Sequence, residues 1–258
     1  MIIKSVNSQC RILGALILRE MQTRFGRQGL GFAWLVGEPM LFCFGVIALW
    51  TATKPAYEHG IRVAPFVMTG YMSLLLIRHM INLLTAAIPA NTGLLYHRQI
   101  APLHLLAARM LLEFGGATVA FLIVYGTLLA LGQVGLPADY LLLYAGWGLV
   151  TWVATGFALV MTGLVMRYEM FERIVGLISY VIIPVSGAFF MVSWLPPAAR
   201  KIVLWIPFVH GVEMIRGGVF GEFVETYFDP SYPLLVGFVL NILGLLLIAG
   251  AMDRIDVD

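Results

Sequence analysis

Residues 140–166 form an apolar run without a single charged side chain. At about 1.5 Å per helical residue, such a run is long enough to cross the roughly 30 Å hydrocarbon layer of a bilayer. Comparable runs recur along the chain, and 60% of all residues are hydrophobic whereas only 12% are charged. Soluble domains carry about 25% charged residues. The sequence therefore predicts an all-α integral membrane protein.

Six apolar segments are predicted to span the membrane as helices. Residues 1–29 before them carry five basic side chains and no cleavable signal peptide pattern, so the N-terminus is predicted to stay in the cytosol. Six crossings return the C-terminus to the same side and place ten of the 16 basic residues there, as the positive-inside rule expects. The predicted spans are residues 30–53, 63–87, 110–131, 140–166, 174–193 and 231–252 of a single domain, 1–258.

Residues 1–29 are predicted to form an amphipathic helix. Leu13, Ile17 and Met21 recur every four residues on one side, and polar residues, Glu20 among them, mostly occupy the rest. A helix with one apolar face and a basic polar face lies in the membrane interface instead of crossing the bilayer.

Residues 194–230 are too apolar for an ordinary loop but contain charged residues and prolines. A seventh span would place Glu213 and Arg216 in lipid, at about 2.5–3.5 kcal/mol each. We therefore predict two short helices, roughly 198–206 and 208–220, that enter the outer leaflet and return. This re-entrant region is a candidate outer gate.

A polar stripe runs along the second of these helices, because His210, Glu213 and Arg216 follow each other at intervals of three. We expect these side chains to be solvated or ion-paired and to line an outer vestibule, with Trp205 beside them. A metal site is the alternative, but no further ligands are close in sequence, and none is predicted.

Arg78 interrupts the second span about 22 Å from its start, hence within about 8 Å of the inner face. Its side chain either snorkels or pairs within the protein, or it contacts an anionic substrate. Glu38 precedes Pro39 near the inner face, where it is a carboxylate at a helix kink or the partner of a basic residue. Trp34, like other aromatic residues at span ends, is an interfacial anchor or faces a sugar chain.

Residues 91–109 mix apolar and polar side chains in a cytosolic loop. A short amphipathic helix there would dock in a groove of a cytosolic protein or rest on the lipid surface. The sequence has no G-x-x-x-x-G-K-[ST] loop, so an ATP-driven role needs a second polypeptide. Its net charge of +2 is too small to indicate a nucleic-acid partner.

Two stretches resemble a known family. Residues 16–41, LILREMQTRFGRQGLGFAWLVGEPML, resemble the entry segment of ABC-2 type permeases, with a basic interfacial helix, Leu-Gly, an aromatic pair and a proline in the first span. Residues 205–220, WIPFVHGVEMIRGGVF, resemble the outer re-entrant segment of the capsule-polysaccharide branch. With the loop that holds Tyr96, His97 and Arg98, the resemblance covers essentially the whole chain.

The resemblance implies half of an exporter in the bacterial inner membrane. Two copies would pair as a homodimer, and each would sit on a separate ATPase subunit that binds ATP and Mg, with no cofactor in this chain. The implied cargo is a lipid-linked anionic polysaccharide in contact with membrane lipid. A periplasmic co-polymerase or adaptor and an outer-membrane exporter would be further partners.

The resemblance also implies roles for particular residues. Residues 92–104, here called the coupling segment, would contact the ATPase, with residues 167–173 as a second contact. Within the coupling segment, the contact residues would be Thr92, Tyr96, His97, Arg98 and His104. Arg19, Arg24, Arg27 and Glu38 would form an inner portal, and Arg78 and Trp34 would lie on a possible substrate path. The outer gate would consist of Trp205, His210, Glu213 and Arg216.

Other functions stay open. Exporters of O-antigen or teichoic acid look much alike, although Glu38 occupies a place where many relatives outside the capsule branch have Asn. A drug or lipid permease of the same superfamily is a further alternative. A membrane-embedded acyl- or glycosyltransferase would use His210 and Glu213 as acid and base, and would show activity from this chain alone.

Overall fold

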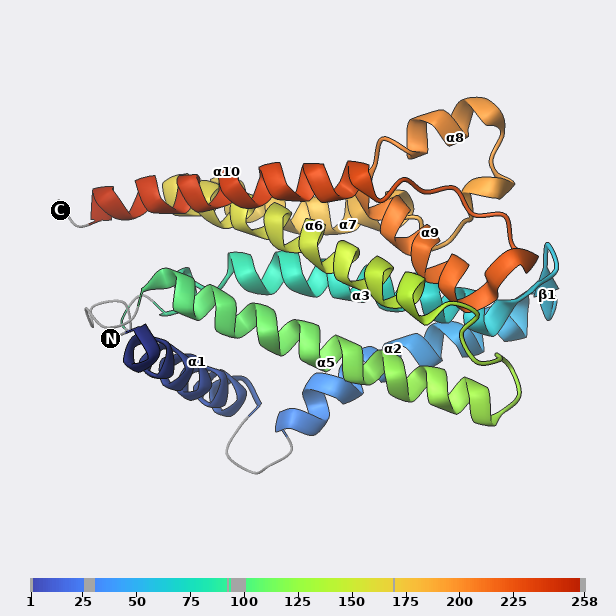
Figure 1. Cartoon of the computed structure of the whole chain (residues 1–258), viewed down its shortest axis with the longest axis horizontal. Helices are drawn as coiled ribbons and strands as arrows, with labels where there is room; N and C mark the ends of the chain where they lie inside the picture. Colours follow the sequence, from blue (N-terminus) through green and yellow to red (C-terminus); the bar gives the residue numbers. More distant parts are fainter. Residues whose placement is uncertain (1, 26–30, 92, 94–100, 169, 256–258) are drawn as a thin grey trace.

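The computed structural model describes residues 2–25, 31–91, 93, 101–168 and 170–255. Long helices lie roughly along the long axis of a bundle (Figure 1). The start of α1 and the end of α10 lie at one end, here called the terminal end, and a short hairpin lies at the other, the hairpin end. The elements in chain order are α1 (Ile2–Phe25), α2 (Gly31–Thr53), β1 (Tyr57–Glu58), β2 (Ile61–Arg62), α3 (Val63–Thr85), the 3-10 helix η1 (Pro89–Asn91), α5 (Pro102–Ala130), α6 (Tyr140–Arg167), α7 (Met170–Val185), η2 (Val192–Trp194), α8 (Pro197–Val203), α9 (Pro207–Phe220), η3 (Gly221–Phe223) and α10 (Ser231–Ile255).

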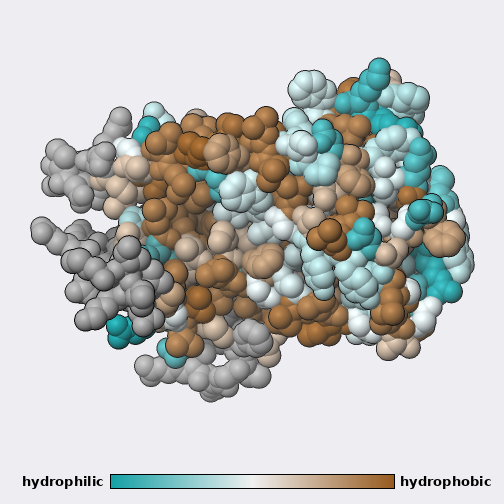
Figure 2. All heavy atoms as spheres, in the orientation of Figure 1, coloured by the Kyte–Doolittle hydropathy of each residue, from teal (hydrophilic) through white to brown (hydrophobic). Residues whose placement is uncertain are grey.

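Five helices of the described chain, α2, α3, α5, α6 and α10, are long and apolar enough to cross a membrane. The prediction of an all-α membrane protein is confirmed. On the visible face, apolar residues form a broad band, and hydrophilic residues gather toward the hairpin end (Figure 2). Helices α2 and α10 keep large apolar side chains exposed, including Leu41, Phe42, Leu235 and Leu246. Such surface is favourable against lipid and unfavourable against water.

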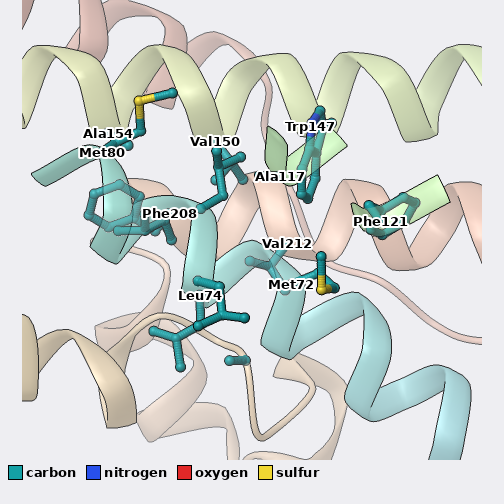
Figure 3. Close-up of a cluster of buried hydrophobic side chains, with 14 of the residues drawn as sticks. Met72, Leu74, Met80, Ala117, Phe121, Trp147, Val150, Ala154, Phe208 and Val212 are labelled. Atoms are coloured by element: carbon teal, nitrogen blue, oxygen red, sulfur yellow. The ribbon is translucent and has the colours of Figure 1, made fainter. Parts of the chain in front are cut away.

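Helix α3 is the centre of the bundle. It packs against α2, α5, α6, α7 and α9, and 18 of its 23 residues are buried. Close packing of this kind fixes the relative positions of the surrounding helices. Figure 3 shows part of this core, to which α3 contributes Met72, Leu74 and Met80, α5 Ala117 and Phe121, α6 Trp147, Val150 and Ala154, and α9 Phe208 and Val212.

Helix α7 differs from the expected fifth span. The sequence predicts residues 174–193, whereas the helix has 16 residues and ends at Val185, one residue after Pro184. At 1.5 Å per residue it is about 24 Å long, short of the hydrocarbon thickness. Proline disrupts the helical hydrogen bonds around it, and Gly187 then takes a positive φ of 83° that favours glycine. The chain continues without regular helix up to η2.

The two short helices of the re-entrant region are present at the expected place. Helices α8 and α9 meet at an angle of 108°, so the chain turns back sharply between them. Both begin with a proline at the first or second helical position, where the missing N–H costs no hydrogen bond. Both lie in the half of the molecule that holds the hairpin (Figure 1). Their depth in a bilayer stays a prediction.

Candidate functional site

The polar stripe of α9 is buried inside the bundle. His210 is 4% exposed, Glu213 1% and Arg216 0%, and an Arg216 Nη1 lies 3.6 Å from Glu213 Oε1. The expectation that this stripe is solvated and lines a vestibule is therefore wrong, and the ion-paired alternative holds. The reason is that α9 packs against both α3 and α6, which leaves its polar side no access to solvent.

Arg216 fastens the irregular segment that follows α7. Its guanidinium donates to the carbonyl oxygens of Gly187 at 2.8 Å, Ala188 at 2.7 Å and Phe190 at 2.5 Å. Its Cζ also lies 4.4 Å from the ring centroid of Phe66 on α3. Backbone carbonyls that follow the end of a buried helix have no partner within that helix, so they need hydrogen-bond donors from elsewhere in the protein. Here the guanidinium of Arg216 supplies these donors.

Glu213 holds two further segments to α9. Its carboxylate accepts hydrogen bonds from the backbone N–H groups of Val192, at 3.3 Å, and Tyr227, at 3.1 Å. Val192 begins η2, and Tyr227 lies in the segment that leads to α10. A buried carboxylate is stable only with such donors and a paired cation. Glu213 thus links η2, α9 and the approach to α10.

His210 is also fully engaged. The N–H of Asp229 donates to its Nδ1 at 2.9 Å, so Nε2 must carry the proton and donate to the carbonyl of Leu204, 2.8 Å away. Neither ring nitrogen is free to bind a metal. Trp205 in the neighbouring turn is different, because 76% of its surface is exposed. Across the described residues, no three His, Cys, Asp or Glu side chains are placed to share a metal ion.

A second buried polar cluster lies on α1. Glu20 is 1% exposed and accepts a hydrogen bond from Arg109 Nε on α5 at 3.0 Å and one from Asn91 Nδ2 on η1 at 3.4 Å. Arg19 donates to Asn91 Oδ1 at 2.8 Å. From the sequence, Glu20 is expected on the polar face of the helix, and this cluster is not predicted. One signal was available, because Glu20 lies one helical turn after Leu16, which is also buried.

Of the coupling segment, the structure describes residue 93 and residues 101–104. His104 lies in the first turn of α5, where its Nδ1 accepts from the N–H of Ala101 at 3.1 Å. Its Nε2 contacts the side-chain oxygen of Gln9 on α1. Helix α5 begins at Pro102, earlier than the predicted start of the third span at 110. Four coupling residues lie outside the described part of the chain: Thr92, Tyr96, His97 and Arg98.

The inner-portal residues are only partly described. Arg19 is bound to Asn91, as stated above. Glu38 is half-buried in α2. The side chain of Arg24 and all of Arg27 lie outside the described part of the chain. A common portal formed by these residues stays a prediction.

Of the two substrate-path candidates, Trp34 on α2 is 56% exposed. Arg78 on α3 faces α7, with its guanidinium carbon 5.9 Å from the ring centroid of Tyr180. Within the described residues, the Nε of Arg78 is buried without a hydrogen-bond partner. A cation held against an aromatic face in this way is weakly paired, and a role in contacting an anion stays a prediction.

This architecture, a bundle of long apolar helices whose buried charges hold helix breaks and helix ends in place, defines a polytopic α-helical membrane protein. The family described as ABC-2 type transporter matches residues 11–220, and the chain belongs to that family.

Several relatives are similar to this chain over nine-tenths or more of its length. It is 39% identical over 247 residues to the capsule polysaccharide export inner-membrane protein CtrC of Neisseria meningitidis serogroup A, a match that covers 96% of this chain and 93% of the relative. It is 36% identical over 245 residues to the capsule polysaccharide export inner-membrane protein BexB of Haemophilus influenzae, covering 95% and 92%. The polysialic acid transport protein KpsM of Escherichia coli is 25% identical over 237 residues, covering 90% of each chain.

Proposed function

We propose that this chain is the membrane subunit of an ATP-driven exporter that moves lipid-linked capsular polysaccharide outward across a bacterial inner membrane. The observation that carries the proposal is the similarity to CtrC and BexB along more than nine-tenths of both chains. The apolar band and the exposed faces of α2 and α10 fit a protein that works within the bilayer.

The proposal includes partners. The chain lacks a phosphate-binding loop, so ATP and Mg would be bound by two copies of a separate ATPase subunit, each seated on one half of a homodimer. A periplasmic adaptor and an outer-membrane exporter would receive the polymer. A transferase role has less support, because His210 and Glu213 are engaged in internal hydrogen bonds.

Deleting the gene from its encapsulated host is expected to abolish surface capsule while the polymer accumulates inside the cell. Surface polysaccharide is measured with a capsule-specific antibody or lectin on intact and on permeabilised cells. The control restores the wild-type gene on a plasmid. Normal surface capsule with loss of O-antigen, teichoic acid or drug resistance in the deletion strain would instead identify one of the alternative substrates.

The orientation is testable with the two native cysteines. Cys10 on α1 is exposed and Cys43 on α2 is buried. A membrane-impermeant maleimide is expected to label Cys10 in inside-out vesicles but not in intact spheroplasts, because α1 is proposed to lie on the cytosolic face. Labelling is read as a mass shift on a gel, and Cys10→Ser is the control. Labelling of Cys10 in intact spheroplasts would reverse the proposed topology.

A further inference from the structure

Helix α1 is hydrogen-bonded to residues on both sides of the coupling segment, residues 92–104. On the preceding flank, Asn91 donates to Glu20 and also to the carbonyl of Ala87, at 3.0 Å. On the following flank, Arg109 donates to Glu20. We propose that Glu20, Asn91 and Arg109 make α1 and the two flanks of the coupling segment move as one body, so that α1 receives the displacement that the ATPase imposes. This inference rests on the proposed function.

The attachment is a closed network and not a single contact. Besides Glu20, Arg109 binds the carbonyl of Leu83 in the last turns of α3, at 2.8 Å. Asn91 also accepts from Arg19, so consecutive residues of α1 hold it. A displacement of the α3 end or the α5 start must therefore carry Glu20 with it or break buried, charge-assisted hydrogen bonds.

A second attachment lies further along α1. His104 on α5 contacts Gln9, which precedes Glu20 by eleven residues, or about 16 Å along a helix. One attachment alone would let α1 pivot about it. Two contacts that far apart along α1, both made to α5, restrict the rotation of α1 relative to α5. Helix α1 is therefore expected to move together with α5.

Burial distinguishes this network from an ordinary surface ion pair. Glu20 is 1% exposed and Arg109 6%, whereas the pair of Lys54 and Glu58, 3.1 Å apart near the hairpin, is partly open to solvent. Removing the charge from one partner of a buried pair leaves the other uncompensated, whereas a solvated pair loses little. Glu58→Gln is therefore a matched control for Glu20→Gln.

The first test compares the two variants in the full complex of permease and ATPase. Per unit of chain in the membrane, an amount that the loss of the buried charge lowers, Glu20→Gln is expected to keep its co-purification with the ATPase and an ATPase rate within about twofold of wild type, while export falls by about tenfold. Glu58→Gln is expected to match wild type in all four measurements. Unchanged export in Glu20→Gln would overturn the inference. Export that falls only in proportion to the membrane level, both in Glu20→Gln and in the milder variant below, would overturn it too.

A milder variant keeps the test decisive if Glu20→Gln fails to fold. Asn91→Ala removes the side-chain hydrogen bonds of Asn91 with Glu20, Arg19 and the carbonyl of Ala87 but leaves the ion pair of Glu20 with Arg109. It is expected to show the same loss of export at normal ATPase activity. Wild-type export in Asn91→Ala would contradict the inference. If the wild-type complex itself exports no capsule, the proposed function fails, which is a separate outcome.

The second test measures the motion. Spin labels are placed on native Cys10 and on an Ala101→Cys substitution beside α5, or on Cys10 and an Ala145→Cys substitution in α6, whose native side chain is exposed. When ATP is trapped in the complex, the first distance is expected to stay constant while the second changes. In Glu20→Gln the first distance distribution is expected to broaden. A shift of the first distance in the wild-type complex would show that α1 and α5 move separately.

Discussion

Arg216→Met is expected to lower the free energy of unfolding by about 3–5 kcal/mol, enough to remove most of the folded protein from the membrane. The substitution deletes the cation that pairs with Glu213 and the donors that serve three backbone carbonyls after α7. The carboxylate and the carbonyls stay buried without these donors, and each lost bond adds to the cost. The measurements are the thermal midpoint of the detergent-purified complex and the membrane level of the chain.

The same substitution at Arg200 is the matched control. Arg200 on α8 is partly exposed, and it donates to the carbonyl of Ser193 at 3.3 Å and lies over the ring of Tyr227, with 4.1 Å from Cζ to the centroid. Because solvent can replace these contacts, Arg200→Met is expected to cost about 1 kcal/mol or less. Equal thermal midpoints for Arg216→Met and Arg200→Met would contradict the structural role given to Arg216.

Glu213→Gln separates charge from hydrogen bonding in the same cluster. The amide oxygen can still accept from Val192 or Tyr227, but the charge that balances Arg216 is lost. Its effect on stability should fall between those of the two arginine variants.

The sequence predicted the parts of the fold that depend on neighbours along the chain. Apolar runs located the five long helices, and the prolines with Glu213 and Arg216 indicated two short helices in place of a span. The end of α7 was placed eight residues too late, because residues 186–193 are apolar and hydropathy alone cannot tell a buried irregular segment from a helix. Pro184 was the local signal for the earlier end.

The buried polar clusters could not be predicted for a different reason. Arg216 binds carbonyls 26 to 29 residues away, and Glu20 binds Arg109 across 89 residues. Periodicity describes one helix and says nothing of the partner that covers its polar face. The periodicity places Glu20 on the polar face of α1, yet a long-range partner makes its burial favourable.

Helix α3 connects the two clusters. Near its start, the ring of Phe66 lies under the Arg216 guanidinium, and in its last turns the carbonyl of Leu83 accepts from Arg109. Between these points the helix is buried in the core (Figure 3). A displacement at the terminal end therefore meets a rigid, closely packed element that reaches the hairpin end. Helix α3 is therefore in direct contact with both buried polar clusters.

The position of α9 also depends on how closely this helix packs against α6. A Cβ added at Gly218 would lie 2.5 Å from the backbone nitrogen of Leu143 and 2.8 Å from the carbonyl oxygen of Asp139. Both atoms belong to the backbone at the start of α6, so neither can move without shifting the helix. Asp139 also donates its N–H to the carbonyl of Gly218 at 2.9 Å. The contact therefore sets the position of α9.

Gly218→Ala is accordingly expected to destabilise the protein by about 2–3 kcal/mol, through overpacking against atoms that cannot yield. Gly217→Ala is the control, since its added Cβ would meet the flexible end of Leu142 at 3.1 Å. Both substitutions raise the intrinsic helix propensity by about 1 kcal/mol. The difference in stability between the two variants therefore reports the cost of packing the added methyl group. The comparison is made by thermal unfolding of the detergent-purified complex and by surface capsule in complemented cells. If the two variants melt at the same temperature, the Gly218 contact does not fix the position of α9 on α6.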